Sequence, residues 1–589
     1  MYCNDSICYN TAIWYTNVTV SFPRRLGNLR QANSLLYLSV WNIEIAIQEA
    51  PQSTLQRFWG RSITVPDIDV TIVQTIISGL ITLVYIYLMR GLSDSALDVC
   101  KVVNKIIDLK QAEAQKKHDY RAIEAFSNLI LLMKVIRSVA SLADSDTDAE
   151  RTESITIFLE VQDELRAITD NNVHTAILFF LAIQSMGKSN VSYASEYFQS
   201  AVSCAEHDND MTAHCMALIG KAWVSFLSGH RAEANEAVTK VVSYATSRPH
   251  VQLHIWALEL DVLINNYPHN AENVEESHRL LRLLQKRDSS QEYNFKKDYF
   301  SAPTACVIAF SYAKNVQRIE REELRRRLEQ DTSDSGRPSF VHRSNPQFSP
   351  EAISSMYERI ALLAVDAVDK MASRKHVFAP ACVQLFCGMY ALADVIDYRR
   401  KNPAVKQPGN SYSERRRSFR PGGASAETTF VSDEVLKKTL RKGLQGLTTH
   451  AERYSFVSPL LWAIQMRFLS IDGDKKVILA VVDEFVEGNQ NLLCQLTFPN
   501  AYLHYQRTIL CRDIGCSTEI MHEQYSDVIA KNCFAELGGC PEDSSVFETL
   551  TLSATAELSS RRKGRDGRLA MNEEVDSNYS VLSDGDSEV

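Results

Sequence analysis

The chain has 589 residues, of which 45% are hydrophobic and 23% charged, and its formal net charge is −9. These proportions are typical of globular proteins and exclude a largely disordered chain or a polytopic membrane protein. The acidic balance argues against nucleic acid as the main partner, because binding a polyanion needs a basic surface.

The predicted elements are helices almost throughout, because apolar residues recur at helical spacing and strand signals are nearly absent. We therefore expect an all-α protein. In chain order we expect an N-terminal helical entry segment at 1–66, a helical repeat array at 67–328, a polar linker at 329–350, a helical pair at 351–398, a basic disordered linker at 399–432, a second helical repeat region at 433–535 and a polar disordered tail at 536–589.

Small residues recur in the array where two helices would pack closely. The positions that follow this spacing are Ala182, Ala194 and Ala201, with Phe198 beside them, in one segment, Leu83, Tyr87, Gly91 and Ala96 in a second, and Ala222, Gly229 and Ala234 in a third. The pattern resembles a divergent tetratricopeptide repeat, although Cys100 and Val238 stand where a larger aromatic residue is usual. The resemblance implies an α-solenoid of antiparallel helix hairpins with a concave binding groove. The alternative is a set of generic helix pairs without repeat ancestry.

The C-terminal half carries a second resemblance. An aromatic-Xaa-Xaa-Pro sequence at Phe456 to Pro459, a turn at Asp472-Gly473 and a helix entered after Phe498-Pro499 are similar to the helical repeat region of soluble-type (type 10) adenylyl cyclases. The catalytic parts of that family are not recognisable in the chain. The resemblance therefore implies a helical scaffold alone.

Residues 70–89 contain no charged residue and are long enough to cross a bilayer as one helix. They also run directly into the first repeat, where a helix covered by its neighbours is equally apolar. We favour the buried helix and a cytoplasmic protein. The alternative is a single-pass membrane protein with the C-terminal part in the cytosol.

No catalytic motif is recognised, so the sequence predicts neither an enzyme nor a cofactor site. Gly187-Lys188-Ser189 lacks the earlier glycine of a phosphate-binding loop, since Ala182 occupies that position. The sequence "HEQYS" begins like a zinc-protease helix, but Ser526 replaces the second histidine ligand. The thirteen cysteines form no CxxC pair, which indicates reduced thiols and no metal site.

Two short features suggest regulation or attachment. Ser418 follows Arg415 and Arg416 in the basic linker, a pattern that resembles the substrates of basophilic kinases. Ser587 and the terminal Val589 resemble a PDZ-domain ligand, which would add a strand to a sheet edge of its partner.

Together these patterns predict a non-catalytic scaffold or regulatory subunit that binds other proteins through its helical array, in the context of signalling. We expect no nucleic acid among its partners. Two alternatives remain, the single-pass membrane protein with a cytosolic docking array and a detached regulatory helical region of a nucleotidyl cyclase or signalling kinase.

Overall fold

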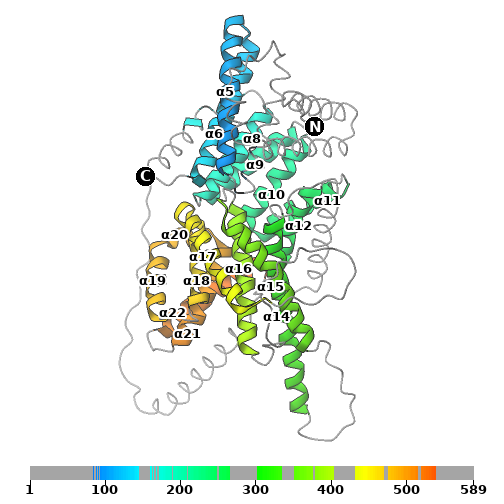
Figure 1. The fold of residues 1–589 in the computed structure, drawn as a ribbon, viewed down its shortest axis with the longest axis vertical. Helices are drawn as coiled ribbons and strands as arrows, with labels where there is room; N and C mark the ends of the chain where they lie inside the picture. Colours follow the sequence, from blue (N-terminus) through cyan, green and yellow to red (C-terminus); the bar gives the residue numbers. More distant parts are fainter. Residues whose placement is uncertain are drawn as a thin grey trace, which may run out of the picture. The chain divides into compact units, whose positions relative to one another are not determined.

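The computed structural model describes part of the chain, and all of that part belongs to one compact unit, Met1–Pro541. The described residues are 84, 88, 91, 93–144, 160, 161, 164, 168, 171–188, 190–207, 210–247, 251–265, 301–333, 350–375, 379–402, 431–469, 475–514 and 519–538. They form helices and turns, and none of them lies in a strand (Figure 1). The prediction of an all-α protein is confirmed for these residues.

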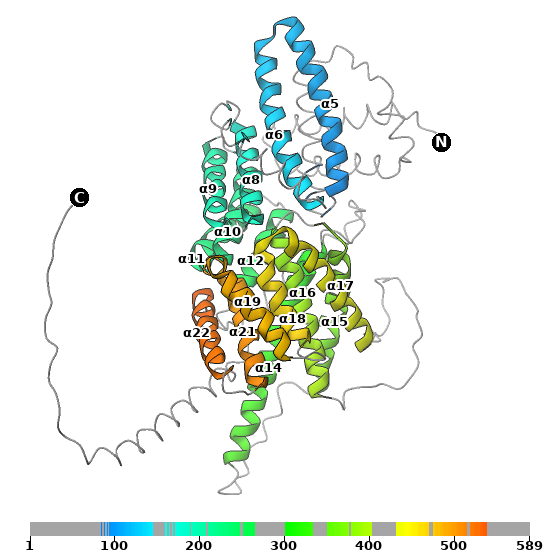
Figure 2. The same ribbon diagram turned by 90° about the vertical axis from the view of Figure 1, so that its left-hand side faces the viewer.

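The described helices differ in length and follow one another along the chain, with no strand among the described residues between them (Figures 1 and 2). They are α5 (Ser93–Lys117), α6 (Tyr120–Asp144), α8 (Asn171–Gly187), α9 (Val191–His207), α10 (Met211–Leu227), α11 (Arg231–Ser247), α12 (Val251–Asn265), α14 (Ser301–Ser333), α15 (Pro350–Ala372), α16 (Ala379–Lys401), α17 (Asp433–Arg453), the 3-10 helix η3 (Ser455–Val457), α18 (Ser458–Leu469), α19 (Lys475–Gly488), α20 (Gln490–Leu493), α21 (Thr497–Ile514) and α22 (Glu519–Leu537).

Several helices extend beyond the predicted boundaries. α14 continues through Ser333, into the predicted linker at 329–350, where Glu and Gln are good helix formers. α16 continues through Lys401, because the cations of its last turn complement the negative end of the helix dipole. The ranges predicted as linkers, 329–350 and 399–432, therefore each include residues that lie in helices. Ser432, the last residue of the predicted basic linker, caps α17 by accepting a hydrogen bond from the N–H of Val435.

The stretch from α8 to α12 is regular in length and spacing. The helices α8, α9, α10 and α11 each have 17 residues, and from Asn171 to Val251 each helix begins 20 residues after the previous one. Helices that follow each other in the chain pack against each other, and α10 also contacts both α8 and α12. The helix pairs α8 with α9 and α10 with α11 therefore begin 40 residues apart.

One backbone turn recurs at the C-terminal ends of α5, α8, α9 and α10. In each case an N–H donates to a carbonyl five residues earlier, the bond that closes a Schellman motif. The four bonds join Asp119 to Ala114 (3.0 Å), Asn190 to Ser185 (2.9 Å), Asp210 to Ala205 (3.0 Å) and His230 to Ser225 (2.8 Å). The preceding residue adopts a left-handed conformation at His118 (φ 55°) and at Gly229 (φ 83°). The same turn thus reverses the chain at four connections.

Side chains at these turns start the next helix. The carboxylate of Asp119 accepts a hydrogen bond from the N–H of Ala122, and that of Asp210 accepts one from the N–H of Ala213, each at 3.1 Å. An Asp at this position satisfies an N–H that has no partner within the helix and favours the positive end of the helix dipole. The connections at Asp119 and Asp210 therefore each close one helix and cap the next.

The helices form an inner row and an outer set. We define the inner row as α8, α10, α12, α14, α16, α18 and α21, in which each helix contacts the next. The outer set is α9, α11, α15, α17, α19 and α22. The outer helices α9 and α11 bury one stripe of mostly small residues and leave the opposite side exposed. α8 and α10 are buried on nearly every side, since they also contact helices from later in the chain.

Aromatic rings of the inner row meet in one cluster. Phe226 of α10 lies 5.1 Å from Phe498 of α21, measured between ring centroids. Tyr502 of α21 lies 5.1 Å from Tyr390 of α16 and 6.2 Å from Phe310 of α14. All five side chains are buried. Burial of such rings contributes the largest apolar area in a core and fixes four helices from distant parts of the chain together.

α16 has the composition of a membrane span but lies inside the protein. Among the described helices it alone is long and apolar enough to cross a bilayer, and the whole of its apolar window is buried within the structure. Of the predicted alternative span at 70–89, the structure describes only Val84 and Leu88, and both are buried.

Candidate functional site

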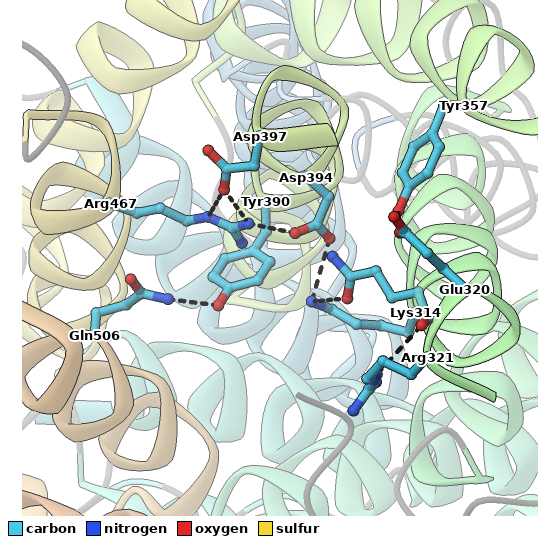
Figure 3. Close-up of polar contacts among 10 residues, drawn as sticks. Lys314, Glu320, Arg321, Tyr357, Tyr390, Asp394, Asp397, Arg467 and Gln506 are labelled. Carbon is cyan, nitrogen blue, oxygen red and sulfur yellow. Dashed lines mark hydrogen bonds and ion pairs between the residues drawn. The ribbon is translucent and has the colours of Figure 1, made fainter. Parts of the chain in front are cut away.

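A concentrated group of charged side chains lies between inner helices (Figure 3). Asp394 of α16 forms an ion pair with Lys314 of α14, with Nζ to Oδ2 at 3.2 Å, and another with Arg467 of α18. The same guanidinium donates to Asp397 at 2.8 Å. Two cations and two carboxylates therefore balance each other between three helices.

The ring of Tyr390 takes part in this group. Lys314 Nζ lies 4.4 Å from the ring centroid of Tyr390, and Arg467 Cζ lies 4.2 Å from it. The phenol oxygen accepts a hydrogen bond from Gln506 Nε2 of α21 at 2.6 Å. Cation–π attraction strengthens as water is excluded, so Tyr390 extends the charge network to a fourth helix.

The protonation of Asp394 is set by two opposing effects. Burial by itself raises the pKa of this carboxyl, but the charges of Arg467 and Lys314 and their hydrogen bonds hold the pKa below its ordinary value. The side chains of Asp394 and Lys314 are almost completely inaccessible to water. An ionised, fully paired carboxylate is a weak general base. The group is suited to fixing four helices and not to proton transfer.

A second polar group joins the inner helices α12, α14 and α16. The buried carboxylate of Glu259 accepts hydrogen bonds from Thr304 and from Gln384, the latter at 2.9 Å. Each partner comes from a different helix. The three helices are thus connected by a buried carboxylate whose two oxygens both have donors.

A third group, on α19, α21 and α22, contains a serine and a histidine. His504 Nδ1 lies 3.3 Å from Ser526 Oγ, and Arg507 Nη1 donates to that same oxygen at 2.7 Å. Arg507 also bonds Asp483 at 2.7 Å and contacts His522 Nδ1 at 2.8 Å. His522 and Ser526 belong to the "HEQYS" sequence, so this sequence supplies partners for a buried arginine.

This serine–histidine pair has the spacing but not the chemistry of a nucleophile and its base. Burial and the charge of Arg507 lower the pKa of His504 to about 3, far from the neutral range in which a general base works. Ser526 is fully buried, and its oxygen already accepts a hydrogen bond from Arg507. The pair therefore holds α21 against α22.

The described cysteines and potential metal ligands also show no arrangement suited to catalysis. Burial raises the pKa of Cys100, of Cys215 and of Cys533, in each case to about 12, so these thiols stay protonated and unreactive. Within the described ranges no three side chains of His, Cys, Asp or Glu are grouped as a metal site would require.

The predicted repeat residues lie at helix contacts and turns where the structure describes them. Ala182, Ala194, Phe198 and Ala201 are buried between α8, α9 and α10, and the ring of Phe198 lies 5.6 Å from that of Phe179. Ala222 and Ala234 are buried on α10 and α11, with Gly229 in the turn between them. Gly91 (φ 68°) precedes the buried Ala96 on α5. Leu83, Tyr87, Ser418, Ser587 and Val589 lie outside the described residues.

Sequence reasoning missed the buried charge network. Its signal was a charged residue within or next to an apolar stretch of helix, as at Lys314, Asp394 and Arg467. Such a residue must find a partner when the helix is buried, but helical periodicity does not say which one. No protein-family model matches the chain, and no curated protein matches it.

Proposed function

We propose that the chain is a non-catalytic scaffold that binds other proteins, built as an α-solenoid of antiparallel, tetratricopeptide-like helix hairpins. The observation that carries this proposal is the recurrence of one hairpin turn at a constant spacing between α8 and α11. Repeated hairpins that pack on their neighbours produce long exposed surfaces, which such proteins use to bind partners.

The packing order supports the solenoid. Inner helices contact each other in chain order from α8 to α21, and the outer helices α15 and α17 also pack together. A tetratricopeptide repeat has about 34 residues. The unit here has 40, because each helix has 17 residues. The proposed likeness to this family therefore rests on the residue pattern, and the longer helices are a departure from it.

The packing also bears on where a partner binds. The sequence suggested the concave side of the array, formed by the inner helices. On this side Phe226 and Gly229 contact the start of α21, and α8 contacts α16 and η3. Since the chain's own helices cover these faces, we assign partner binding to the exposed outer helices.

The buried polar groups support a role without covalent chemistry. The carboxylates and cations of the Asp394 and Arg507 groups are paired with one another, Glu259 accepts from two neutral donors, and His504 is held neutral by its surroundings. A cytoplasmic location is supported by the free thiols among the described cysteines and by the burial of Val84 and Leu88. Ser418 and the terminal Val589 remain candidate points of regulation and PDZ attachment within this proposal.

The proposal is tested by capture followed by reconstitution. The whole chain is immobilised, captured proteins are identified by mass spectrometry, and each is purified and titrated against the chain by calorimetry. We expect at least one partner to form a stoichiometric complex that protects outer-helix amides from hydrogen exchange, with neither protein covalently changed. Turnover of a substrate by the purified chain, or the failure of every captured protein to form a complex, would contradict the scaffold.

The membrane alternative has a separate test. Alkaline carbonate extraction of the expressed protein should release it completely into the soluble fraction. Asn17 begins an Asn-Val-Thr sequence, which would accept a glycan if the N-terminal part lay outside the cell. Retention of the chain in the pellet, together with a glycosidase-sensitive mass at Asn17, would instead favour the single span at 70–89.

A further inference from the structure

The exposed outer side of α15 and α17 combines unpaired cations with apolar side chains. α15 and α17 lie side by side (Figure 2) and run in the same direction. Arg399 joins Glu358 to Asp433 near one end, at 2.6 and 2.7 Å. Toward the other end, a β-carbon on Gly446 would lie 2.7 Å from the carbonyl oxygen of Ala372. The two helices thus form one continuous, firmly held outer surface.

The cations of this surface are not neutralised by the fold. Lys437, Lys438 and Arg441 occupy two turns of α17, and Arg359 lies on the exposed side of α15. Among the described residues none of these four side chains has an ion-pair or hydrogen-bond partner. Unpaired cations this close together raise the local positive potential.

The neighbouring carboxylates, in contrast, are already occupied. Asp433 is bound by Arg399, Asp369 by Lys442 at 2.6 Å, and Asp366 by Lys370. Glu434 is the exposed exception. The surface therefore carries a positive excess in a chain whose formal net charge is −9.

Two large apolar side chains are exposed on the same pair of helices. Leu362 of α15 is 38% accessible and Val435 of α17 is 42% accessible. With the offset set by the Arg399 and Lys442 contacts, both lie in the first half of the paired region, beside the four cations. An apolar residue flanked by carboxylates would match this arrangement.

We propose that the outer surface of α15 and α17, formed by Arg359, Leu362, Val435, Lys437, Lys438 and Arg441, binds an acidic peptide segment of a partner protein. The inference rests on the proposed scaffold function and names the surface and the partner's chemistry. Its cations span about 6 Å along α17, from a rise of 1.5 Å per residue. Same-side residues of an extended peptide are about 6.6 Å apart, and the side chain between them points away. Two carboxylates at alternate positions would therefore meet these cations from one side of the peptide.

A peptide fits this surface better than another polyanion does. Specific binding of duplex nucleic acid generally uses about six to ten phosphate contacts along the backbone, and this surface offers four cations on two helices. Leu362 and Val435 would also have no role against a phosphate backbone. Nucleic acid and anionic lipid are therefore the contrasting outcomes of the test.

The test uses the whole chain and a defined probe. The probe is a fluorescent twelve-residue peptide in which Glu alternates with Leu or Ser, and the control peptide carries Gln in place of each Glu. Binding is followed by fluorescence anisotropy at low and at physiological salt. We expect the Glu peptide alone to bind, with hydrogen-exchange protection confined to α15 and the first half of α17.

Matched variants locate the site. The double variant Lys438→Glu with Arg441→Glu should weaken peptide binding by about tenfold or more, the loss expected for charge-assisted contacts at an interface. The control variant Lys101→Glu with Lys240→Glu makes the same change of net charge on α5 and α11, where both lysines are exposed, and should bind normally. A Leu362→Ser with Val435→Ser variant should weaken binding without changing its salt dependence.

Each result decides the proposal. Equal binding by the α17 variant and the control, or binding of the Gln peptide as tightly as the Glu peptide, overturns it. Binding of a single-stranded oligonucleotide or of phosphatidylserine vesicles that the α17 variant abolishes, without peptide binding, assigns the surface to another polyanion and also overturns it. If the peptide fails while captured partners still form complexes with the α17 variant, the scaffold stands and this surface is excluded. If the captured proteins form no complex with the wild-type chain either, both proposals fall.

Discussion

Gly229, in the turn between α10 and α11, lies against Thr497, the first residue of α21. A β-carbon at Gly229 would come within 2.6 Å of the Thr497 hydroxyl and 2.9 Å of Glu536 Oε2. Thr497 donates a hydrogen bond to that carboxylate at 3.0 Å. The turn between α10 and α11 therefore lies against the hydrogen bond that joins α21 to α22. The nearby rings of Phe226 and Phe498 extend this contact.

Replacing Gly229 should destabilise both the turn between α10 and α11 and its contact with α21. Gly229→Ala places a side chain in a left-handed conformation (φ 83°) and against Thr497. We expect it to lower the free energy of unfolding by about 2 kcal/mol or more, since the substitution is strained in conformation and in space. Urea unfolding followed by circular dichroism measures the loss. In a double-mutant cycle with Thr497→Ala, the two costs should be less than additive. Strict additivity would mean that the contact carries no energy.

A second glycine tests the packing of α9 on α10. A β-carbon at Gly220 would lie 2.2 Å from the ring of Phe198. Gly220→Ala should destabilise the protein by about 1–3 kcal/mol through overpacking, although alanine is the better helix former. Gly488→Ala on α19 is the matched control, because nothing lies within 4 Å of its added β-carbon. The control should be neutral or stabilising in the same urea titration. A Gly220→Ala variant as stable as the control would show that Phe198 is not packed as described.

The residues of this contact illustrate what the sequence could predict. Ala194, Phe198 and Ala201 lie three or four positions apart, so a local pattern was enough to place them on one buried face of α9. The all-α class followed from the same periodicity. Lys314, Asp394 and Arg467 lie on separate helices far apart in the chain, and no local pattern joins them.

The composition of α16 shows a second limit. Its residues are buried on every side because α14, α15, α17 and α18 surround it. A helix of this kind is as apolar as a membrane span, so the sequence alone does not distinguish the two. The distinction depends on which helices pack around it, and this is decided by contacts between distant segments. For the same reason, the sequence did not predict that α16 and α21 cover the inner faces of α8 and α10.

The network around Asp394 should respond to substitution and to pH. Asp394→Asn keeps the shape but leaves the buried cations Lys314 and Arg467 with too little negative charge. We expect a loss of roughly 3–5 kcal/mol at neutral pH, the usual cost of breaking a buried ion pair. Because the pKa of Asp394 in the folded protein is below the ordinary 3.8, its ionisation stabilises the fold above that pH. The difference in stability between the wild type and Asp394→Asn should therefore stay constant from pH 7 to about pH 5 and shrink at lower pH.

Urea titrations of both proteins at several pH values measure that difference. Asp366→Asn is a suitable control, since Asp366 lies on the exposed side of α15 and pairs only with the next turn through Lys370. Its effect should be small at every pH. A difference for Asp394→Asn that grows as the pH falls would contradict an ionised, stabilising carboxylate.

His504 should make the protein less stable in mild acid. Burial and the charge of Arg507 lower its pKa in the folded protein to about 3, whereas an ordinary histidine has a pKa of 6.5. The unfolded chain therefore binds a proton that the folded chain excludes, so stability is complete above about pH 6.5 and falls by up to about 1.4 kcal/mol per pH unit below it. Nδ1 of His504 lies 3.3 Å from Ser526 Oγ, and its ring centroid lies 6.0 Å from that of Tyr525. His504→Gln should flatten the decline between pH 6.5 and 4, while the control His207→Gln, at an exposed position on α9, should retain it.

In a proton NMR titration the ring resonances of His504 should not move between pH 8 and 5. A midpoint near pH 6.5 for His504 would show that the ring is accessible and would reopen the serine–histidine pair as a reactive site.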